Sequence, residues 1–265
     1  GALSVAGASW MGVRHSRRTL VRDSVSPNSS GARSYGVKLL GLIGGTSWES
    51  TAVYYRLLNE MAKAHLGSTH SQPMLIYSFD FDAVRTNTLA ENWGEVARMM
   101  VAEARRLEAA GADGLMICAN TMHRVANEVE AAISIPFIHL LDSLAVEAKA
   151  RGFGTLGVLG TRFTMLDPFY CGRLEGRHGL KTLVPEGDDL ELVHWTIFNE
   201  LTQGRVLEST REKHRRVIER LAARGAQAIV LGCTEHRMML SAEDSPVPLL
   251  DTTEIHCRKA FEFAR

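Results

Sequence analysis

The chain has 265 residues, of which 45% are hydrophobic, and its 30 basic and 30 acidic residues give no formal net charge. This balance excludes the strongly basic footprint typical of a nucleic-acid-binding protein, and no apolar run approaches the roughly 18 residues of a membrane span. The four cysteines, at positions 118, 171, 233 and 257, form neither a CxxC pair nor a zinc spacing with histidine, which argues against a disulfide framework and a metal site and predicts a reducing compartment.

The first 36 residues differ in composition from the rest of the chain. They contain five arginines, no lysine and a single acidic residue, Asp23. This bias resembles an organelle transit peptide, although a disordered extension fits the composition equally well. The predicted location is therefore the cytoplasm, or an organelle if residues 1–36 act as a transit peptide.

From Val37 onward, short apolar runs alternate with segments of helical periodicity. In the first half, the predicted strands are 37–45, 74–79, 115–118 and 135–139, and the predicted helices are 50–65, 92–110, 122–133 and 143–151. Short apolar strands that alternate with amphipathic helices are typical of a parallel sheet covered on both faces.

The second half of the chain repeats this scheme. Residues 225–235 resemble residues 111–121 when the two segments are aligned without a gap, 114 residues apart. The predicted strand 156–161 echoes the first strand, the predicted helix 208–224 matches 92–110, and 247–251 matches 135–139. We therefore predict an internal duplication of nearly everything after Val37.

The duplication predicts an α/β fold of two pseudo-symmetric lobes, each a parallel sheet flanked by helices. We expect the first lobe at 37–139, the second at 140–246, and a C-terminal segment of about 247–265 that packs back on the first. Open parallel sheets bind ligands outside the carboxyl ends of their strands, where both halves place Gly, Thr, Asn and Cys residues. The predicted active site is therefore the cleft between the lobes.

Cys233 is the candidate catalytic residue. It follows a predicted buried strand and precedes Thr234 and Glu235, which lead into a helix. Because a helix N-terminus stabilises an anion, we expect a lowered thiol pKa and a usable base or nucleophile; a buried structural cysteine is the alternative. The equivalent position in the first half is Ala119, so only one side of the cleft carries a thiol.

Hydroxyl and amide side chains at these turns are candidates for binding a carboxylate. Asn120 and Thr121 offer donors together with unsatisfied backbone N–H groups, although an ordinary helix cap uses the same residue types. The glycine turns after the first strand of each half could also hold an anion. The predicted substrate-binding set consists of Thr46, Ser47, Arg85, Asn120, Thr121, Thr161, Thr234 and Glu235.

Other residues of this region have a purely structural interpretation as well as a functional one. His123 could shuttle a proton, or it could be a packing histidine. Arg85 could clamp a carboxylate through its bidentate fork, or lie solvated in a loop. Cys118 should face the core because successive strand residues point to opposite faces, and we interpret Cys171 and Cys257 as structural.

Three motifs together resemble the aspartate/glutamate racemase family, the cofactor-independent amino-acid racemases. They are Gly41-Leu-Ile-Gly-Gly-Thr-Ser-Trp-Glu-Ser50, Asn120-Thr-Met-His123 and Gly232-Cys-Thr-Glu235. The resemblance runs from about Val37 to the C-terminus. It implies two pseudo-symmetric α/β lobes, a homodimer, an amino-acid substrate, and catalysis without PLP or another cofactor.

The resemblance also assigns roles to residues. In this family two cysteines, one per lobe, act as base and acid on opposite faces of the α-carbon, and Cys233 matches the second-lobe cysteine. The implied substrate contacts are Asn120, Thr121 and Thr234 to the α-carboxylate and Arg85 to the side-chain carboxylate. Ala119 departs from the pattern, although some relatives have threonine there, and a family lysine of the second lobe is not reproduced near Asp189–Glu191.

We therefore predict a PLP-independent isomerase that interconverts the L and D forms of an amino acid, aspartate or glutamate, with Cys233 abstracting the α-proton. Reprotonation of the opposite face would need water, Thr121 or His123. Two other functions stay open: a single-cysteine decarboxylase of a malonate-type substrate, similar to an arylmalonate decarboxylase of the same superfamily, and a non-catalytic carboxylate-binding homologue.

Overall fold

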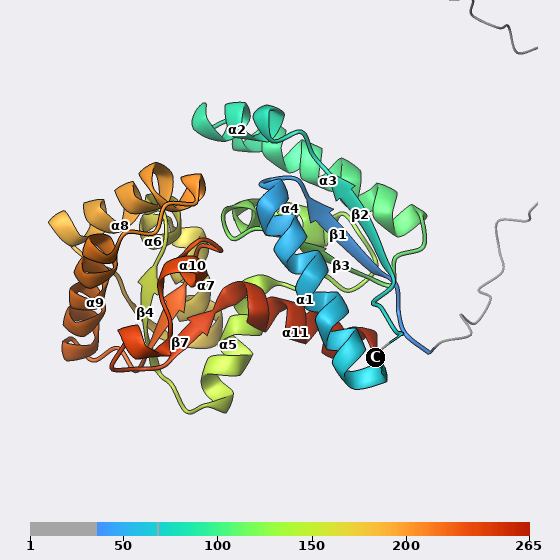
Figure 1. Cartoon of the computed structure of the whole chain (residues 1–265). Helices are drawn as coiled ribbons and strands as arrows, with labels where there is room; N and C mark the ends of the chain where they lie inside the picture. The colour runs from blue at the N-terminus through green and yellow to red at the C-terminus, as the bar shows by residue number, and fades with distance from the viewer. Residues whose placement is uncertain (1–35, 68) are drawn as a thin grey trace, which may run out of the picture. The chain divides into compact units, whose positions relative to one another are not determined.

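Two parallel sheets, each covered by helices, make up the part of the chain that the computed structural model describes, residues 36–67 and 69–265 (Figure 1). We call each sheet with the helices packed on it a lobe. The fold class predicted from the sequence is confirmed. The predicted N-terminal extension lies outside the described residues, apart from Gly36.

The first sheet has the strand order β2-β1-β3, with all strands parallel. Its strands are β1 (Leu40–Gly44), β2 (Met74–Ser78) and β3 (Gly114–Ile117). The helices of this half are α1 (Trp48–Leu66), α2 (Phe81–Leu89), α3 (Trp93–Ala109), the 3-10 helix η1 (Thr121–Val125), α4 (Ala126–Ala131) and α5 (Leu140–Ala150). Every residue of β1 and β3 is buried, as their unbroken apolar runs predict.

The second sheet has the order β5-β4-β6-β7, again all parallel. Its strands are β4 (Thr155–Leu159), β5 (Lys181–Leu183), β6 (Ala228–Leu231) and β7 (Leu249–Asp251). The helices of this half are α6 (Arg162–Leu166), α7 (Pro168–His178), α8 (Asp188–Asn199), η2 (Leu201–Gln203), α9 (Glu208–Ala223), α10 (His236–Met239), η3 (Ala242–Asp244) and α11 (Thr252–Ala264).

The strand register confirms the predicted duplication. Gly41 of β1 pairs with Leu115 of β3, and the equivalent Gly157 of β4 pairs with Ile229 of β6. The two halves therefore share strand order, direction and register. Because side chains alternate between the faces of a sheet, a slip of one residue would have turned each set of side chains to the opposite face.

The strand predicted at 135–139 is wrong as a full strand. It makes a single bridge, between Phe137 and Leu115, because the next backbone groups bond to side chains: Ile138 O accepts from His256 Nε2 at 2.6 Å, and Leu140 N donates to His123 Nε2 at 3.2 Å. The helix predicted at 122–133 also differs, since it opens as the 3-10 helix η1 before it becomes α4.

The sequence did not predict α2, α6, α7, α8 or β5. Helix α2 shows why, because Val84 is its one buried residue and its apolar periodicity is correspondingly weak. What begins α2 is local, since the Asp80 carboxylate accepts a hydrogen bond from Asp82 N at 3.2 Å.

The last helix of each half packs on the core of the other lobe. Helix α11 follows the second sheet, yet Phe261 and Ala260 pack with Leu40 and Tyr54 in the first core, and α11 runs beside α1 (Figure 1). Helix α5 follows the first half, yet it belongs to the core around β4 and β6. The two lobes therefore depend on each other, and the boundaries at 139 and 246 stay predictions.

The turn after β1 requires glycine at position 45. Gly45 has φ +77°, and a Cβ there would lie 2.1 Å from the backbone nitrogen of Phe79. We expect Gly45→Ala to lower the free energy of unfolding by about 1–3 kcal/mol from the backbone conformation alone, and by more because Phe79 must move. Urea unfolding measures this change.

The matched control for Gly45→Ala is Gly94→Ala in the first turn of α3. Gly94 has an ordinary φ and nothing within 4 Å of an added Cβ. We expect it to be neutral or stabilising by about 0.5–1 kcal/mol. Equal unfolding free energies for the two variants would contradict the requirement for glycine at position 45.

Candidate active site

The carboxyl ends of the two sheets meet through direct hydrogen bonds. Thr234, just after β6, donates from its hydroxyl to Ser50 Oγ at 3.3 Å, and Ser50 donates in turn to the backbone oxygen of Cys118 at 2.9 Å. These bonds join the turn after β6 to the first turn of α1 and the end of β3. They fix the candidate site at the edge where ligands of parallel sheets bind.

Asn120 forms a second connection between the lobes. Its side-chain nitrogen donates to Thr252 Oγ1 at 3.1 Å, and its oxygen accepts from the Tyr170 hydroxyl at 3.1 Å. The residue is 8% exposed. Because an amide nitrogen carries two N–H groups, one donor remains for a substrate, and the substrate contact predicted for Asn120 stays a prediction.

Cys233 lies two residues after the end of β6 and is half-buried, whereas Cys118 and Cys257 are fully buried. Its thiol donates a hydrogen bond to Glu235 Oε2 at 2.7 Å. Burial raises the pKa of the Cys233 thiol well above its ordinary value, and the nearby carboxylate of Glu235 raises it further. The thiol therefore holds its proton at neutral pH.

The lowered pKa predicted for Cys233 is wrong. The hydrogen bonds from the backbone of Thr234 and Glu235 do act to lower the thiol pKa, but burial and the Glu235 charge outweigh them. Helix α10 begins only at His236 and spans four residues. A helix this short has a weak dipole, so its N-terminus does little to stabilise a thiolate at Cys233. The sequence showed Glu235 but not that its carboxylate turns back onto the sulfur.

Thr46 has an unpaired hydroxyl at the candidate site. The residue lies in the turn after β1 and is 8% exposed, and its Oγ1 has no hydrogen-bond partner among the described residues. A buried hydroxyl without a partner costs free energy. Thr46 is therefore the best-supported member of the predicted substrate-binding set.

Ser47 and Thr161 cap helices instead. Ser47 accepts a hydrogen bond from Ser50 N at 3.1 Å at the start of α1, and Thr161 accepts one from Thr164 N at 3.4 Å at the start of α6. The capping alternative that we raised for Asn120 and Thr121 is thus found at these two other turns, whereas the Asn120 side chain makes no cap hydrogen bond. Thr121 opens η1 and is half-buried.

His123 is held on both ring nitrogens by the backbone. Its Nδ1 donates to the oxygen of Ala119 at 2.7 Å, and its Nε2 accepts from Leu140 N at 3.2 Å. Burial lowers its pKa to about 4. This geometry favours the packing interpretation: His123 positions the Ala119 carbonyl and has no nitrogen left to shuttle a proton.

The remaining candidates differ in their placement. Arg85 lies on α2 with an exposed side chain. Cys118 is buried in the core as predicted, and its desolvation raises its pKa. Cys171 is half-buried beside the backbone oxygen of Met165 at 3.7 Å.

A buried histidine follows the candidate site in sequence. His236 comes directly after Glu235, is fully buried, and neither ring nitrogen has a hydrogen-bond partner in the described part of the chain. Its ring lies 6.0 Å from that of His214, which is also buried. Burial lowers the pKa of His236 to about 3, so a neutral imidazole supports the turn that carries Cys233.

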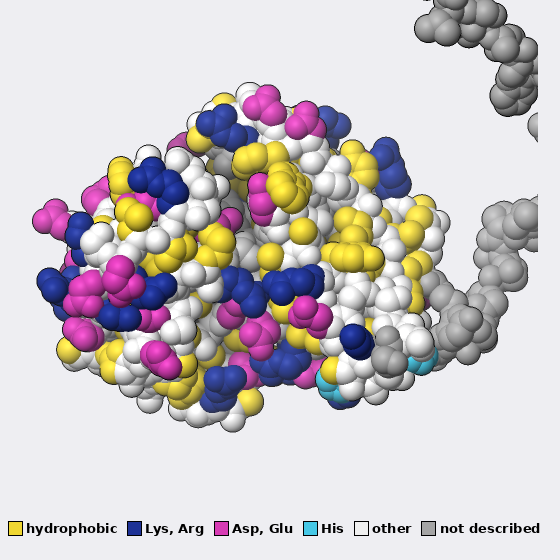
Figure 2. All heavy atoms as spheres, viewed as in Figure 1, with side chains coloured by type: hydrophobic (Ala, Val, Ile, Leu, Met, Phe, Trp, Pro, Cys, Tyr) yellow, Lys and Arg dark blue, Asp and Glu magenta, His cyan; other side chains and the backbone are white. Residues whose placement is uncertain are grey.

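On the face shown in Figure 2, basic and acidic side chains are intermixed. Over α9, for example, Arg211 pairs with Glu208 and Arg216 with Glu212.

Within residues 36–67 and 69–265, no helix is long and apolar enough to cross a membrane. In the same residues, no group of three or more His, Cys, Asp or Glu side chains could hold a metal ion.

The fold and the site define a two-lobed α/β protein with one thiol where the strand ends of its lobes meet. The model of the Asp/Glu/hydantoin racemase family matches residues 43–260, and the chain belongs to this family. The resemblance seen in the sequence is thereby confirmed.

Solved structures of relatives agree with this assignment. A proposed Asp/Glu racemase from Yersinia pestis is 43% identical, with a TM-score of 0.83, over 85% of this chain and 98% of that chain. An aspartate racemase homologue from Pyrococcus horikoshii OT3 is 32% identical, with a TM-score of 0.77, over 85% and 98% of the two chains. A relative found by sequence, the broad specificity amino-acid racemase RacX of Bacillus subtilis (strain 168), is 21% identical over 223 residues, 81% of this chain and 93% of RacX.

Proposed function

We propose that the protein is a PLP-independent racemase of an acidic amino acid, aspartate or glutamate, and that Cys233 acts on the α-proton. The observation that carries this proposal is the hydrogen bond from the Cys233 thiol to Glu235, at the edge where the two lobes touch. Membership of the Asp/Glu/hydantoin racemase family supports the reaction class.

Cys233 and Glu235 act together as the base. The Cα–H bond breaks and a new S–H bond forms, while the proton that the sulfur carried passes to Glu235 Oε2. The electron pair left on Cα delocalises into the α-carboxylate as an enediolate. Transfer to Glu235 is needed because a thiol with a raised pKa is rarely ionised beforehand.

Donors around the turns hold the substrate carboxylate as its charge grows. The unpaired Thr46 hydroxyl, the second N–H of Asn120, and the hydroxyls of Thr121 and Thr234 are the groups we assign to it. Arg85 is the group we assign to the side-chain carboxylate, which requires that it turn inward from its exposed position on α2.

The two faces of Cα differ in the acid/base groups beside them. On the face of Ala119 there is a methyl group in place of a thiol, and His123 is bound on both nitrogens. Water, or water held by Thr121, therefore delivers the proton there, and Glu235 returns its extra proton to solvent. The proton on sulfur exchanges with solvent through Glu235, and return of a solvent proton from sulfur to the same face is then faster than inversion.

The test is deuterium exchange at the α-carbon, followed by proton NMR in D2O for each enantiomer of aspartate and glutamate. We expect one enantiomer of a substrate to exchange faster than it racemises, and its mirror image to exchange more slowly. No exchange with any acidic amino acid would overturn the proposal, and thermal stabilisation by the same amino acids without exchange would favour a carboxylate-binding protein.

A second candidate function is the decarboxylation of a malonate-type substrate. The observation in its favour is the single thiol opposite Ala119, because a carbanion formed by loss of carbon dioxide needs one acid and no base on the other face. Release of carbon dioxide from an arylmalonate, without exchange on amino acids, would replace the first proposal by this one.

A further inference from the structure

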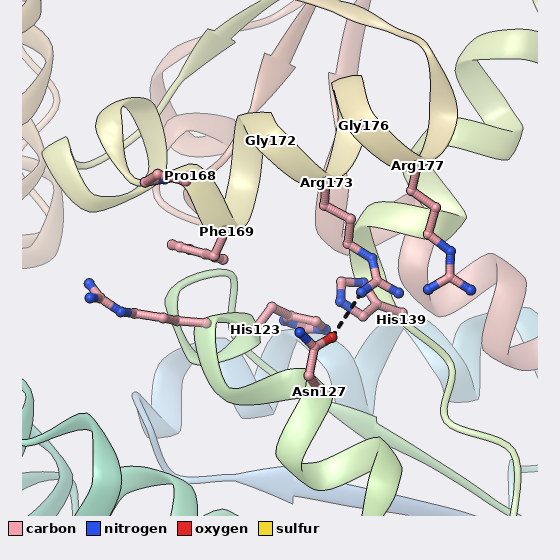
Figure 3. A pocket seen from close by; sticks show the side chains of 10 residues that line it. His123, Asn127, His139, Pro168, Phe169, Gly172, Arg173, Gly176 and Arg177 are labelled. Atoms are coloured by element: carbon pink, nitrogen blue, oxygen red, sulfur yellow. Dashed lines mark hydrogen bonds between the residues drawn. The ribbon is translucent and has the colours of Figure 1, made fainter.

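A pocket of about 390 Å³ lies between residues of the two lobes (Figure 3), and Cys233 is not among its lining residues. The first half contributes Asn127 of α4 and His139, and α7 of the second lobe contributes Phe169, Arg173 and Arg177. This volume falls within the range of about 300–1,000 Å³ that is usual for small-molecule sites. None of the lining residues is acidic.

The polar groups of this pocket are donors. Arg173 donates to Asn127 Oδ1 at 3.3 Å, which leaves the NH2 group of Asn127 for a ligand (Figure 3). His139 accepts from Leu141 N on Nδ1 at 3.1 Å, so in its neutral form the hydrogen is on Nε2. His139 is 4% exposed, and its donor is therefore fixed in place by packing.

The charge of Arg177 is only weakly compensated by a carboxylate. Arg173 binds Asp142 through two hydrogen bonds of 2.8 Å, and His178 also binds Asp142, at 2.7 Å. Arg177 reaches Asp142 only at 3.9 Å and is 57% exposed. The shared carboxylate is thus already occupied, and the pocket presents a net positive edge at Arg177.

We propose that this pocket binds a small organic anion. Its carboxylate or phosphate group accepts hydrogen bonds from Arg177, Arg173, Asn127 and His139, and its apolar part lies against Phe169. Charge-assisted hydrogen bonds of this kind are about twice as strong as neutral ones. The ligand would contact residues of both lobes at once.

A path from this anion site to the catalytic edge already exists in the fold. His123 lines the pocket, its ring lies 4.7 Å from that of His139, and it donates to the backbone oxygen of Ala119. A ligand bound at His139 is therefore linked through His123 to the turn that carries Ala119.

The test is isothermal titration calorimetry near pH 7.5 with phenyl phosphate, benzoate and neutral benzamide as probes. We expect at least one of the two anions, but not the amide, to bind at millimolar concentration, and the stronger of them identifies the preferred acid group. Arg177→Gln should weaken that binding about three- to tenfold, as expected for the loss of a partly exposed charged donor. Asn127→Ala should weaken it as well.

The matched control is Arg216→Gln on α9, an arginine that is 63% exposed and lies outside the pocket. It should bind the anions as the unmodified protein does. Equal binding by Arg177→Gln and the unmodified protein would place the anions elsewhere, at the catalytic edge for instance, and would overturn the proposal. Equal binding of benzamide, or no binding of either anion, would do the same.

Discussion

Cys233→Ser is expected to lower the rate of α-proton exchange by about 10²–10⁴-fold, the usual contribution of a positioned acid/base group. Serine keeps the size and the hydrogen bond to Glu235, so the fold should not change, but its hydroxyl holds its proton far more tightly than a thiol. Exchange in D2O measures the loss. Cys171→Ser is the control, because that thiol is half-buried in the second lobe and donates to the backbone oxygen of Met165 at 3.7 Å, not to a carboxylate.

Glu235→Gln separates two roles of the carboxylate. If Glu235 takes the thiol's proton, the variant loses activity near neutral pH by about tenfold or more and regains part of it as the pH rises and the thiol ionises by itself. If Glu235 merely raises the thiol pKa, its removal makes the thiolate commoner and the variant faster. A higher exchange rate for Glu235→Gln at neutral pH would therefore contradict the shared-proton mechanism.

Alkylation of Cys233 gives an independent check on the same pair. The raised pKa predicts slow reaction with iodoacetamide at neutral pH, since the thiolate is the reactive form. Glu235→Gln should accelerate the alkylation even while it slows exchange. A faster alkylation together with a slower exchange distinguishes a proton acceptor from a residue that only shapes the site.

The core strands of each sheet could be predicted because each one is a continuous apolar run in the sequence. β1, β3 and β6 are short apolar runs buried along their whole length, and the spacing between the repeats sets equivalent pairs such as Gly41 with Leu115 and Gly157 with Ile229. We expected about 247–265 to pack back on the first lobe, but the apolar periodicity of the last helices carries no signal for this exchange. Phe261 reads as an ordinary apolar helix residue whether it packs on its own lobe or the other.

The candidate site was predictable in its position but not in its electrostatics. A cysteine after a buried strand, paired by the duplication with Ala119, could be found from spacing alone. The pKa of that cysteine depends on how deeply it is buried and where the Glu235 side chain turns, and both are properties of packing. The bond between Ser50 and Thr234 likewise joins residues 184 positions apart and leaves no trace in either motif.

Acid should destabilise this protein well before its carboxylates titrate. Burial lowers the pKa of His123 to about 4 and those of His236 and His256 to about 3, and it lowers the pKa of His139 as well. Below the ordinary histidine pKa of about 6.5, the unfolded chain binds protons that the folded chain refuses. Stability is therefore complete above about pH 6.5 and falls as the pH drops toward about 4.

We expect each of these histidines to remove about 2 kcal/mol of unfolding free energy at pH 5 by this linkage, and the set to remove several. Urea unfolding at pH 7.5 and pH 5 measures the loss. His236→Leu should reduce the difference in unfolding free energy between pH 7.5 and pH 5 by about the contribution of one histidine. The fold should tolerate the change, because His236 has no hydrogen-bond partner to lose. His70→Gln is the control, since His70 is exposed. If His236→Leu keeps the full pH dependence, His236 takes up a proton in the folded state, and the turn that carries Cys233 rests on a charged imidazole.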